Sequence, residues 1–191
     1  MTKAANIAGE HGRQSVVPLF GALATGGEKE GSMKVNTMRC KLCHGEMALR
    51  SLDALAGEEH GVRVSIEGMP AMQCPEGHKR FVAPDFAVKL MQALLADEKL
   101  VALDAAAQKG LLRKHCCCPG CGKELAGTDG SVAAKRVLEL DGLEAFGVQI
   151  ELPRYRCPAC SHESVPTEKA VVDGLMKASA NAFRSAQVEP T

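Results

Sequence analysis

Aromatic side chains are scarce in this chain of 191 residues: it has no Trp, one Tyr and five Phe. Surfaces that bind single-stranded nucleic acid by base stacking depend on such rings, so the composition disfavours that function. The chain also lacks an excess of charge, because 23 Lys and Arg residues balance 23 Asp and Glu residues. This balance disfavours a protein that coats nucleic acid through a strongly basic surface.

Long apolar runs and familiar catalytic motifs are absent as well. No segment approaches the roughly 18 apolar residues that identify a membrane-spanning helix. The sequence contains no glycine-rich phosphate loop, no nucleophile elbow and no His-Glu-x-x-His motif. We therefore expect a cytoplasmic protein that binds no membrane and is not an enzyme.

The composition is otherwise that of a folded chain, except at its beginning. A content of 46% hydrophobic and 24% charged residues is typical of globular proteins. Residues 1–37 are rich in small residues, and we expect a disordered leader there. Its one apolar run, at 16–24, is short and contains Pro18, which disfavours a secretory signal. Met1 and Met33 both remain possible starts.

Cysteine is what the chain has in abundance. It has nine Cys and six His, and most of the cysteines occur in closely spaced pairs. In a reducing compartment, such pairs are typical of metal binding or thiol redox chemistry rather than of a disulfide framework.

The cysteine motifs occur twice, which indicates an internal duplication. Three motifs recur in the same order: C-x-x-C-x-x-E at 40–46 and 118–124, V-x-I-E at 64–67 and 148–151, and P-x-x-x-C-P at 70–75 and 153–158. Each copy closes on one further candidate ligand, His78 in the first and Cys160 in the second.

We predict two metal sites of four ligands each, the number and residue types that zinc prefers. The first set is Cys40, Cys43, Cys74 and His78. The second set is Cys118, Cys121, Cys157 and Cys160. Modules this small need such a link to fold, and four protein ligands leave no position for a substrate. We therefore expect two structural zinc ions, with iron as an alternative at the four-cysteine set.

A second interpretation of the first pair is a haem attachment site. Residues 40–44 read CKLCH, which matches the motif for c-type haem. The other copy disfavours this interpretation, because Gly122 stands where the first copy has His44.

Two cysteines belong to neither set. Cys116 and Cys117 lie beside His115 and the cations Arg113 and Lys114. Neighbouring positive charge acidifies thiols, so this pair is a candidate for redox chemistry. The alternatives are spare cysteines in a turn, or a replacement ligand for the same ion.

The spacing of apolar residues predicts the secondary structure. Alternation is typical of half-buried strands, and apolar residues three or four apart are typical of helices. The predicted strands are 62–66, 80–82, 146–152 and 163–165. The predicted helices are 85–95, 97–108 and 168–184.

These elements predict an α+β fold with two tandem small zinc-ribbon β modules, each followed by helices. The predicted parts are a leader at 1–37, zinc ribbon 1 at 38–83, a helical linker at 84–114, zinc ribbon 2 at 115–166, a C-terminal helix at 167–185 and a tail at 186–191.

The paired motifs resemble those of the zinc-ribbon superfamily. Within it, MRCKLCHGEMAL…VSIEGMPAMQCPEGH is similar to the zinc-binding N-terminal domain of the MqsA/YgiT-type antitoxins. The resemblance covers residues 38 to about 82, and more loosely 118–165. It implies a ribbon around one structural zinc and a surface that binds protein. The separate helix-turn-helix domain with which those antitoxins read DNA has no clear counterpart in this sequence.

The predicted function is that of a non-enzymatic zinc-binding protein whose two ribbons present a protein-interaction surface. The partner is another protein or a second copy of the chain. One alternative is a transcription-related nucleic-acid binder, suggested by basic residues near the cysteine pairs, such as Arg39, Lys41 and Arg50. Another is a thiol redox or metal sensor that uses Cys116 and Cys117.

Overall fold

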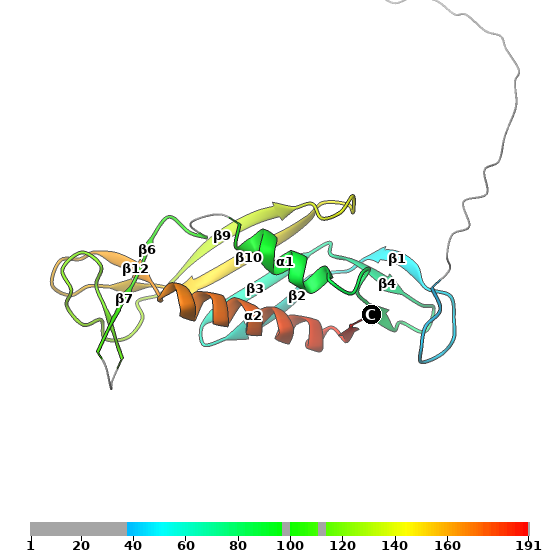
Figure 1. The fold of residues 1–191 in the computed structure, drawn as a ribbon, viewed down its shortest axis with the longest axis horizontal. Helices are drawn as coiled ribbons and strands as arrows, with labels where there is room; N and C mark the ends of the chain where they lie inside the picture. The colour runs from blue at the N-terminus through cyan, green and yellow to red at the C-terminus, as the bar shows by residue number, and fades with distance from the viewer. Residues whose placement is uncertain (1–37, 97–99, 111–113, 191) are drawn as a thin grey trace, which may run out of the picture. The chain divides into compact units, whose positions relative to one another are not determined.

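The computed structural model describes residues 38–96, 100–110 and 114–190. The predicted leader therefore lies outside the described residues. Within them, the chain forms two helices and thirteen short strands in four sheets (Figure 1), which confirms the predicted α+β class. None of the described helices is long and apolar enough to cross a membrane.

The central sheet contains one β-hairpin from each half of the chain. The first half (residues 38–110) supplies β2 (Leu55–Glu59) and β3 (Val62–Glu67). The second half (residues 114–190) supplies β9 (Ser131–Leu138) and β10 (Phe146–Pro153). The strand order is β2-β3-β10-β9, and all neighbours are antiparallel. The strands predicted at 62–66 and 146–152 are thus confirmed.

The two hairpins meet through a symmetric pairing of β3 with β10. Ser65 lies opposite Gln149, and these residues hold the same place in the repeated V-x-I-E motif. The pairs on either side are Val64 with Ile150 and Ile66 with Val148. The register therefore has an approximate two-fold axis at Ser65 and Gln149. Because the strands are antiparallel, they leave the sheet in opposite directions toward their own cysteines.

One face of this sheet is covered by α1 (Phe86–Leu94) and α2 (Glu168–Ser185). These bounds confirm the helices predicted at 85–95 and 168–184. Alternate residues of β3 and β10 are buried against the helices, as strand geometry requires. The helices contact each other, since the Ser179 hydroxyl donates to the Met91 sulfur at 3.8 Å.

Each helix contacts the hairpin of the other half. The helix α2 packs on β2 and β3, and α1 contacts the second half through Phe86, whose ring centroid lies 6.1 Å from that of Phe146. Short strands exchange in the same way: β6 (Asp104–Ala105) pairs parallel with β12 (Glu163–Val165), and β13 (Val188–Glu189) pairs parallel with β5 (Lys79–Arg80). The apolar face of each half is therefore buried by the other.

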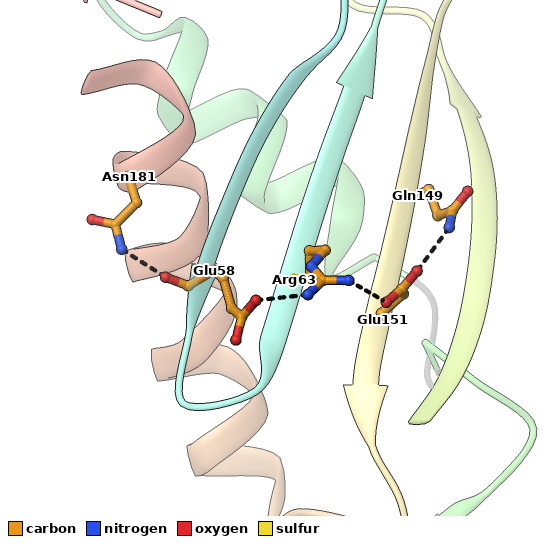
Figure 2. Close-up of polar contacts among 5 residues, drawn as sticks. All are labelled: Glu58, Arg63, Gln149, Glu151 and Asn181. Carbon is orange, nitrogen blue, oxygen red and sulfur yellow. Dashed lines mark hydrogen bonds and ion pairs between the residues drawn. The ribbon is translucent and has the colours of Figure 1, made fainter. Parts of the chain in front are cut away.

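A polar network crosses the junction between the halves (Figure 2). Arg63 donates to Glu58 at 2.8 Å and to Glu151 at 3.2 Å, and Gln149 donates to Glu151 at 3.1 Å. The Asn181 amide donates to the Glu58 carbonyl at 2.8 Å, which ties α2 to the edge strand β2. Exposed ion pairs contribute only about 0–1 kcal/mol each to the free energy of unfolding. The network therefore helps to align β3 with β10 more than it stabilises the fold.

The remaining strands surround the cysteine motifs. Around the first motifs, β1 (Ala48–Ser51) and β4 (Pro70–Gln73) form a sheet of order β1-β4-β5-β13. Around the second, β11 (Tyr155–Arg156) joins the sheet β11-β12-β6, and β7 (Ala107–Lys109) pairs with β8 (His115–Cys117). The strand predicted at 163–165 is confirmed, and the one predicted at 80–82 is observed at Lys79–Arg80.

The helix predicted at 97–108 is wrong where the structure describes it. Residues 97–99 lie outside the described residues, and the segment that follows contains β6 and β7 instead. Among its described residues, the linker predicted at 84–114 is accordingly helical only in α1. Alanine-rich segments favour helix, but tertiary pairing overrides that weak preference. The division of the chain into separate modules stays a prediction. Both halves contribute strands to the central sheet.

Candidate metal centres

The first Cys-x-x-Cys pair lies in a tight turn held by backbone hydrogen bonds. The Cys40 N–H donates to the Gly45 carbonyl at 2.8 Å, and the His44 N–H donates to the Cys40 carbonyl at 3.0 Å. His44 has a φ of 59°, in the left-handed region that non-glycine residues seldom occupy. The side chain of His44 is not among the clustered ligands, so the haem interpretation gains no support from its position.

The second Cys-x-x-Cys pair adopts the same turn. The Cys118 N–H donates to the Lys123 carbonyl at 2.8 Å, and the Gly122 N–H donates to the Cys118 carbonyl at 2.9 Å. Gly122 has a φ of 73°, and glycine meets this requirement without a steric cost. Gly122 therefore suits the turn that the second pair adopts.

The closing turns differ between the two halves by one residue. The Cys74 N–H donates to the His78 carbonyl at 3.1 Å, whereas the Cys157 N–H donates to the His162 carbonyl at 2.9 Å. The longer second turn places Cys160 inside it. In the shorter first turn, the candidate ligand is His78, at the end of the turn.

The structure brings the first predicted ligand set together. The candidate ligand atoms of Cys40, Cys43, Cys74 and His78 all lie within 4.8 Å of one another. The Cys43 and Cys74 sulfurs are 3.5 Å apart. The His78 Nδ1 atom lies 3.4 Å from the Cys74 sulfur and 3.5 Å from the Cys40 sulfur. Cys40 and Cys74 are buried, while the other two side chains are half-buried.

The second predicted set also forms a cluster. The sulfurs of Cys118, Cys121, Cys157 and Cys160 lie within the same 4.8 Å limit. The Cys118–Cys160 separation is 3.6 Å, and Cys121 lies 3.5 Å from both Cys157 and Cys160. Cys118 and Cys157 are buried, whereas Cys121 and Cys160 are exposed.

These separations suit a tetrahedral metal ion. A Zn–S bond of about 2.3 Å gives a tetrahedron whose edges are about 3.8 Å. The sulfur separations of 3.5–3.6 Å are close to that edge, and they are far longer than a disulfide bond of about 2.05 Å. All nine cysteines are free thiols. The donor sets, three sulfurs with one imidazole and four sulfurs, are both established structural zinc sets.

Backbone amides acidify one thiol in each cluster. The amide of Cys43 lowers the pKa of Cys40 to about 6, against the opposing effect of burial. The amides of Ala159 and Cys160 lower the pKa of Cys157 to about 6 in the same way. The thiolate is the form that binds metal, so each turn favours the state that a metal site requires.

A second thiol in each cluster has the opposite shift. The backbone amide of His162 lowers the pKa of Cys160, but the hydrogen bond with Cys121, burial and the other thiols together raise it to about 12. The amide of Gly45 likewise lowers the pKa of Cys43, but burial and the neighbouring thiols outweigh it and raise the pKa. Thiols held this close resist carrying negative charge together unless a cation compensates them.

Cys116 and Cys117 lie outside both clusters. They belong to β8, where Cys116 is half-buried and Cys117 is buried, with its sulfur 3.9 Å from the His115 carbonyl. His115 pairs with Glu124 at 2.8 Å, and Arg113 lies outside the described residues. Burial, with a smaller contribution from Cys116, raises the pKa of Tyr155. No described contact activates either thiol, and the redox interpretation stays a prediction.

The cysteine motifs assigned no ligand role to His162. Its carbonyl accepts from the Cys157 N–H, and its Nε2 atom lies 3.7 Å from an Asp104 carboxylate oxygen on β6. His162 thus links the closing turn of the second cluster to the strand contributed by the first half. In the sequence, only its position two residues after Cys160 indicated that His162 lies near the second cluster.

The clusters define a protein with two four-ligand sites suited to metal ions, on an α+β fold. Comparisons with models of protein families, with curated proteins and with solved structures give no match to this chain. The resemblance to zinc ribbons and to the MqsA/YgiT-type domain therefore stays a prediction.

Proposed function

We propose that both clusters bind zinc and that both ions are structural. The observation that carries this proposal is the convergence of four ligand atoms within 4.8 Å in each cluster. A bound ion would join the two turns of each half, which are distant in sequence. Structural zinc contributes about 10–16 kcal/mol to the folding of small finger peptides. With four side-chain ligands, neither site offers an open coordination position for catalysis.

Metal content tests this first step. We expect the native mass spectrum of protein purified under reducing conditions to show two zinc ions per chain. Chelation is expected to remove the zinc and to reduce the far-ultraviolet circular dichroism of the folded chain together, because the ions hold the turns. Iron in the four-cysteine cluster would favour the alternative ion, and a metal-free folded protein would refute the proposal.

We further propose that the two halves arose by duplication and that the first half has gained a protein-binding surface. Leu42 and Leu49 are 60% and 52% exposed, which is unusual for leucine. At the corresponding places of the second motif stand Gly120 and Gly127. The apolar side chains are therefore not required by the turn itself.

Cations accompany these leucines. Arg39, Lys41 and Arg50 are all exposed, and they take part in none of the ion pairs that join described residues. The knuckle surface is defined here as Leu42, Leu49, Arg39 and Lys41. Arg50 follows Leu49 directly on β1, so its side chain points to the other face of that strand. A protein segment that carries apolar side chains beside carboxylates matches this surface. Phosphate backbones are bound by charge and hydrogen bonding. Binding to a nucleic-acid backbone would therefore not account for the two exposed leucines.

A defined peptide tests the knuckle surface. We expect a fluorescent amphipathic peptide of Leu and Glu to bind the wild-type protein. The L42G/L49G variant, which carries the glycines of the second half, should bind it at least about tenfold more weakly, because central apolar anchors supply much of an interface energy. Fluorescence anisotropy measures both affinities.

Two controls make the peptide experiment specific. Val137 is 77% exposed on the central sheet, and V137S is expected to bind like wild type. A duplex DNA of mixed sequence serves as the competing probe. Tighter binding to DNA than to the peptide, with a linear loss of affinity against log salt, would favour the nucleic-acid alternative. Equal peptide binding by wild type and L42G/L49G would refute the knuckle surface.

A further inference from the structure

The two clusters differ in how far their ligands are exposed. In the second cluster, Cys121 and Cys160 are exposed, while Cys118 and Cys157 are buried. In the first cluster, all four ligands are buried or half-buried. A reagent dissolved in water therefore reaches two sulfurs of the second cluster directly, whereas the ligands of the first cluster are at least partly covered.

The exposed pair also differs from its counterpart in chemistry. Cys121 and Cys160 come from the two turns of the second cluster, and their sulfurs are 3.5 Å apart. Closing this gap by roughly 1.5 Å would give the length of a disulfide bond. By the order of the repeated motifs, the corresponding pair in the first cluster is Cys43 and His78. An imidazole forms no disulfide, so this reaction is open to the exposed pair and not to its counterpart.

The other close pairs of sulfurs each include a buried thiol. Cys121 also lies 3.5 Å from Cys157, and Cys43 lies 3.5 Å from Cys74. Cys157 and Cys74 are buried, however, and each packs in a small apolar cluster. Side chains packed at interior density do not shift without disturbing their neighbours. Cys121 and Cys160 are both exposed, so this pair can close its gap with the least disturbance.

Charge favours oxidation of the same cluster. Zinc with four thiolates carries one more negative charge than zinc with three thiolates and a neutral imidazole. Greater negative charge makes the ligand sulfurs better nucleophiles toward an oxidant, and the oxidation of cysteine follows thiolate character and exposure. Both properties are greater in the second cluster, with its four cysteines and two exposed sulfurs.

We infer that Cys121 and Cys160 form a reversible oxidation site, at which hydrogen peroxide joins the two sulfurs and releases the zinc ion of the second cluster. The first cluster keeps its ion under the same conditions. This inference rests on the zinc occupancy proposed above. It concerns ligands of the second cluster and assigns no part to Cys116 or Cys117.

The reaction takes two steps. The thiolate of one exposed cysteine attacks an oxygen of the peroxide, the O–O bond breaks, and the sulfur becomes a sulfenic acid while hydroxide leaves. The other thiolate then attacks that sulfur, the S–S bond forms, and the S–O bond breaks to release a second hydroxide. Two protons from solvent convert both hydroxides to water. The two sulfurs lose two electrons in total, the peroxide gains them, and the zinc ion keeps its oxidation state.

The disulfide takes over part of the structural role of the ion. Cys118 and Cys157 remain as thiolate ligands of the cluster, and two ligands are too few for structural zinc. The new bond joins the Cys-x-x-Cys turn to the closing turn, the same two segments that the ion would join. We therefore expect oxidised protein to keep more of its far-ultraviolet circular dichroism than protein whose zinc is removed by chelation.

Hydrogen peroxide added to the two-zinc protein tests the site. We expect a chromophoric chelator to detect one released zinc ion per chain, and native mass spectrometry to show one retained ion and a polypeptide lighter by two hydrogen atoms. Fragmentation of the linked peptides should place the disulfide between Cys121 and Cys160. Dithiothreitol with zinc should restore the second ion. A disulfide that joins other cysteines, or release of both ions together, would overturn the inference.

Two variants separate this site from the alternatives. C160H gives the second cluster the donor set of the first, and we expect its zinc release by peroxide to be at least about tenfold slower than in wild type. C116S/C117S is the matched control, since neither sulfur belongs to a cluster, and it should release zinc at the wild-type rate. Wild-type release from a two-zinc C160H, or loss of release in C116S/C117S, would overturn the inference. If C160H fails to bind two ions, the disulfide map of C116S/C117S decides alone.

Metal content before oxidation keeps this inference distinct from the function on which it rests. A protein purified without zinc would refute the proposed zinc sites and, with them, the release of zinc. A protein that holds two zinc ions and keeps both under excess peroxide would overturn the oxidation site alone and leave the zinc sites in place.

Discussion

A Cys157→Ser protein is expected to bind one metal ion instead of two and to lose at least about 4 kcal/mol of unfolding free energy. Cys157 is buried in the second cluster and bonded through its backbone to the closing turn. Its loss leaves three sulfurs for an ion that prefers four ligands. Native mass spectrometry counts the ions, and urea unfolding followed by circular dichroism measures the stability.

The effect of Cys157→Ser should not remain local. The β12 strand that follows the second cluster pairs with β6, which belongs to the first half. Cobalt(II) substitution separates the two sites, because a four-sulfur site and a three-sulfur, one-nitrogen site have different visible spectra. We expect the remaining ion of Cys157→Ser to have the three-sulfur spectrum and to exchange faster than in wild type.

Cys117→Ser is the matched control for that variant. Cys117 is buried and adjacent to Cys118, but its sulfur is outside the cluster. We expect two bound ions and a loss of only about 1 kcal/mol, a usual cost for a small change at a buried position. Loss of an ion in Cys117→Ser, with both ions retained in Cys157→Ser, would show that the assigned ligand set is wrong.

Gly57→Val is expected to disrupt the contact between α2 and the central sheet. A Cβ atom at Gly57 would lie 2.1 Å from the Ala178 carbonyl oxygen and 2.4 Å from the Ala182 nitrogen. Both are backbone atoms of α2, so no side-chain rotation relieves the overlap. We expect a loss of roughly 3 kcal/mol or more, at the upper end of overpacking costs, measured by urea unfolding.

Ala56→Val tests whether the position, rather than the added volume, is responsible. Ala56 neighbours Gly57 on β2 and is exposed on the opposite face of the sheet. Valine favours strands, so this variant should match or slightly exceed wild type in stability. Equal losses in Ala56→Val and Gly57→Val would mean that α2 does not approach β2 as closely as the structure places it.

The sequence predicted the two ligand sets because their information is local. Two residues between paired cysteines define a turn, and the order of the motifs assigns each pair to its partner. The same holds for α1 and α2, whose apolar residues recur at helical spacing within the segment itself. The ligand sets and the two helices depend on residues close together in the chain, and a sequence motif or an apolar repeat can describe such residues.

The sequence did not predict how the halves combine. The pairing of Ser65 with Gln149 joins residues far apart in the chain, and nothing near either residue specifies that partner. The exchange of helices is equally non-local. The incorrect helix at 97–108 has the same origin, since β6 forms only because β12 is present to pair with it. Gly57 gave no signal either, because its role depends on the position of α2.

The exchanged helices have a consequence for synthesis of the chain. The apolar face of β2 and β3 is covered by α2, which ends at Ser185. The first hairpin is therefore made early and stays uncovered until α2 has left the ribosome. Newly made chains expose apolar surface and strand edges that favour aggregation. Pausing translation before α2 should thus leave a nascent chain that requires chaperones, whereas emergence of α2 allows both halves to close together.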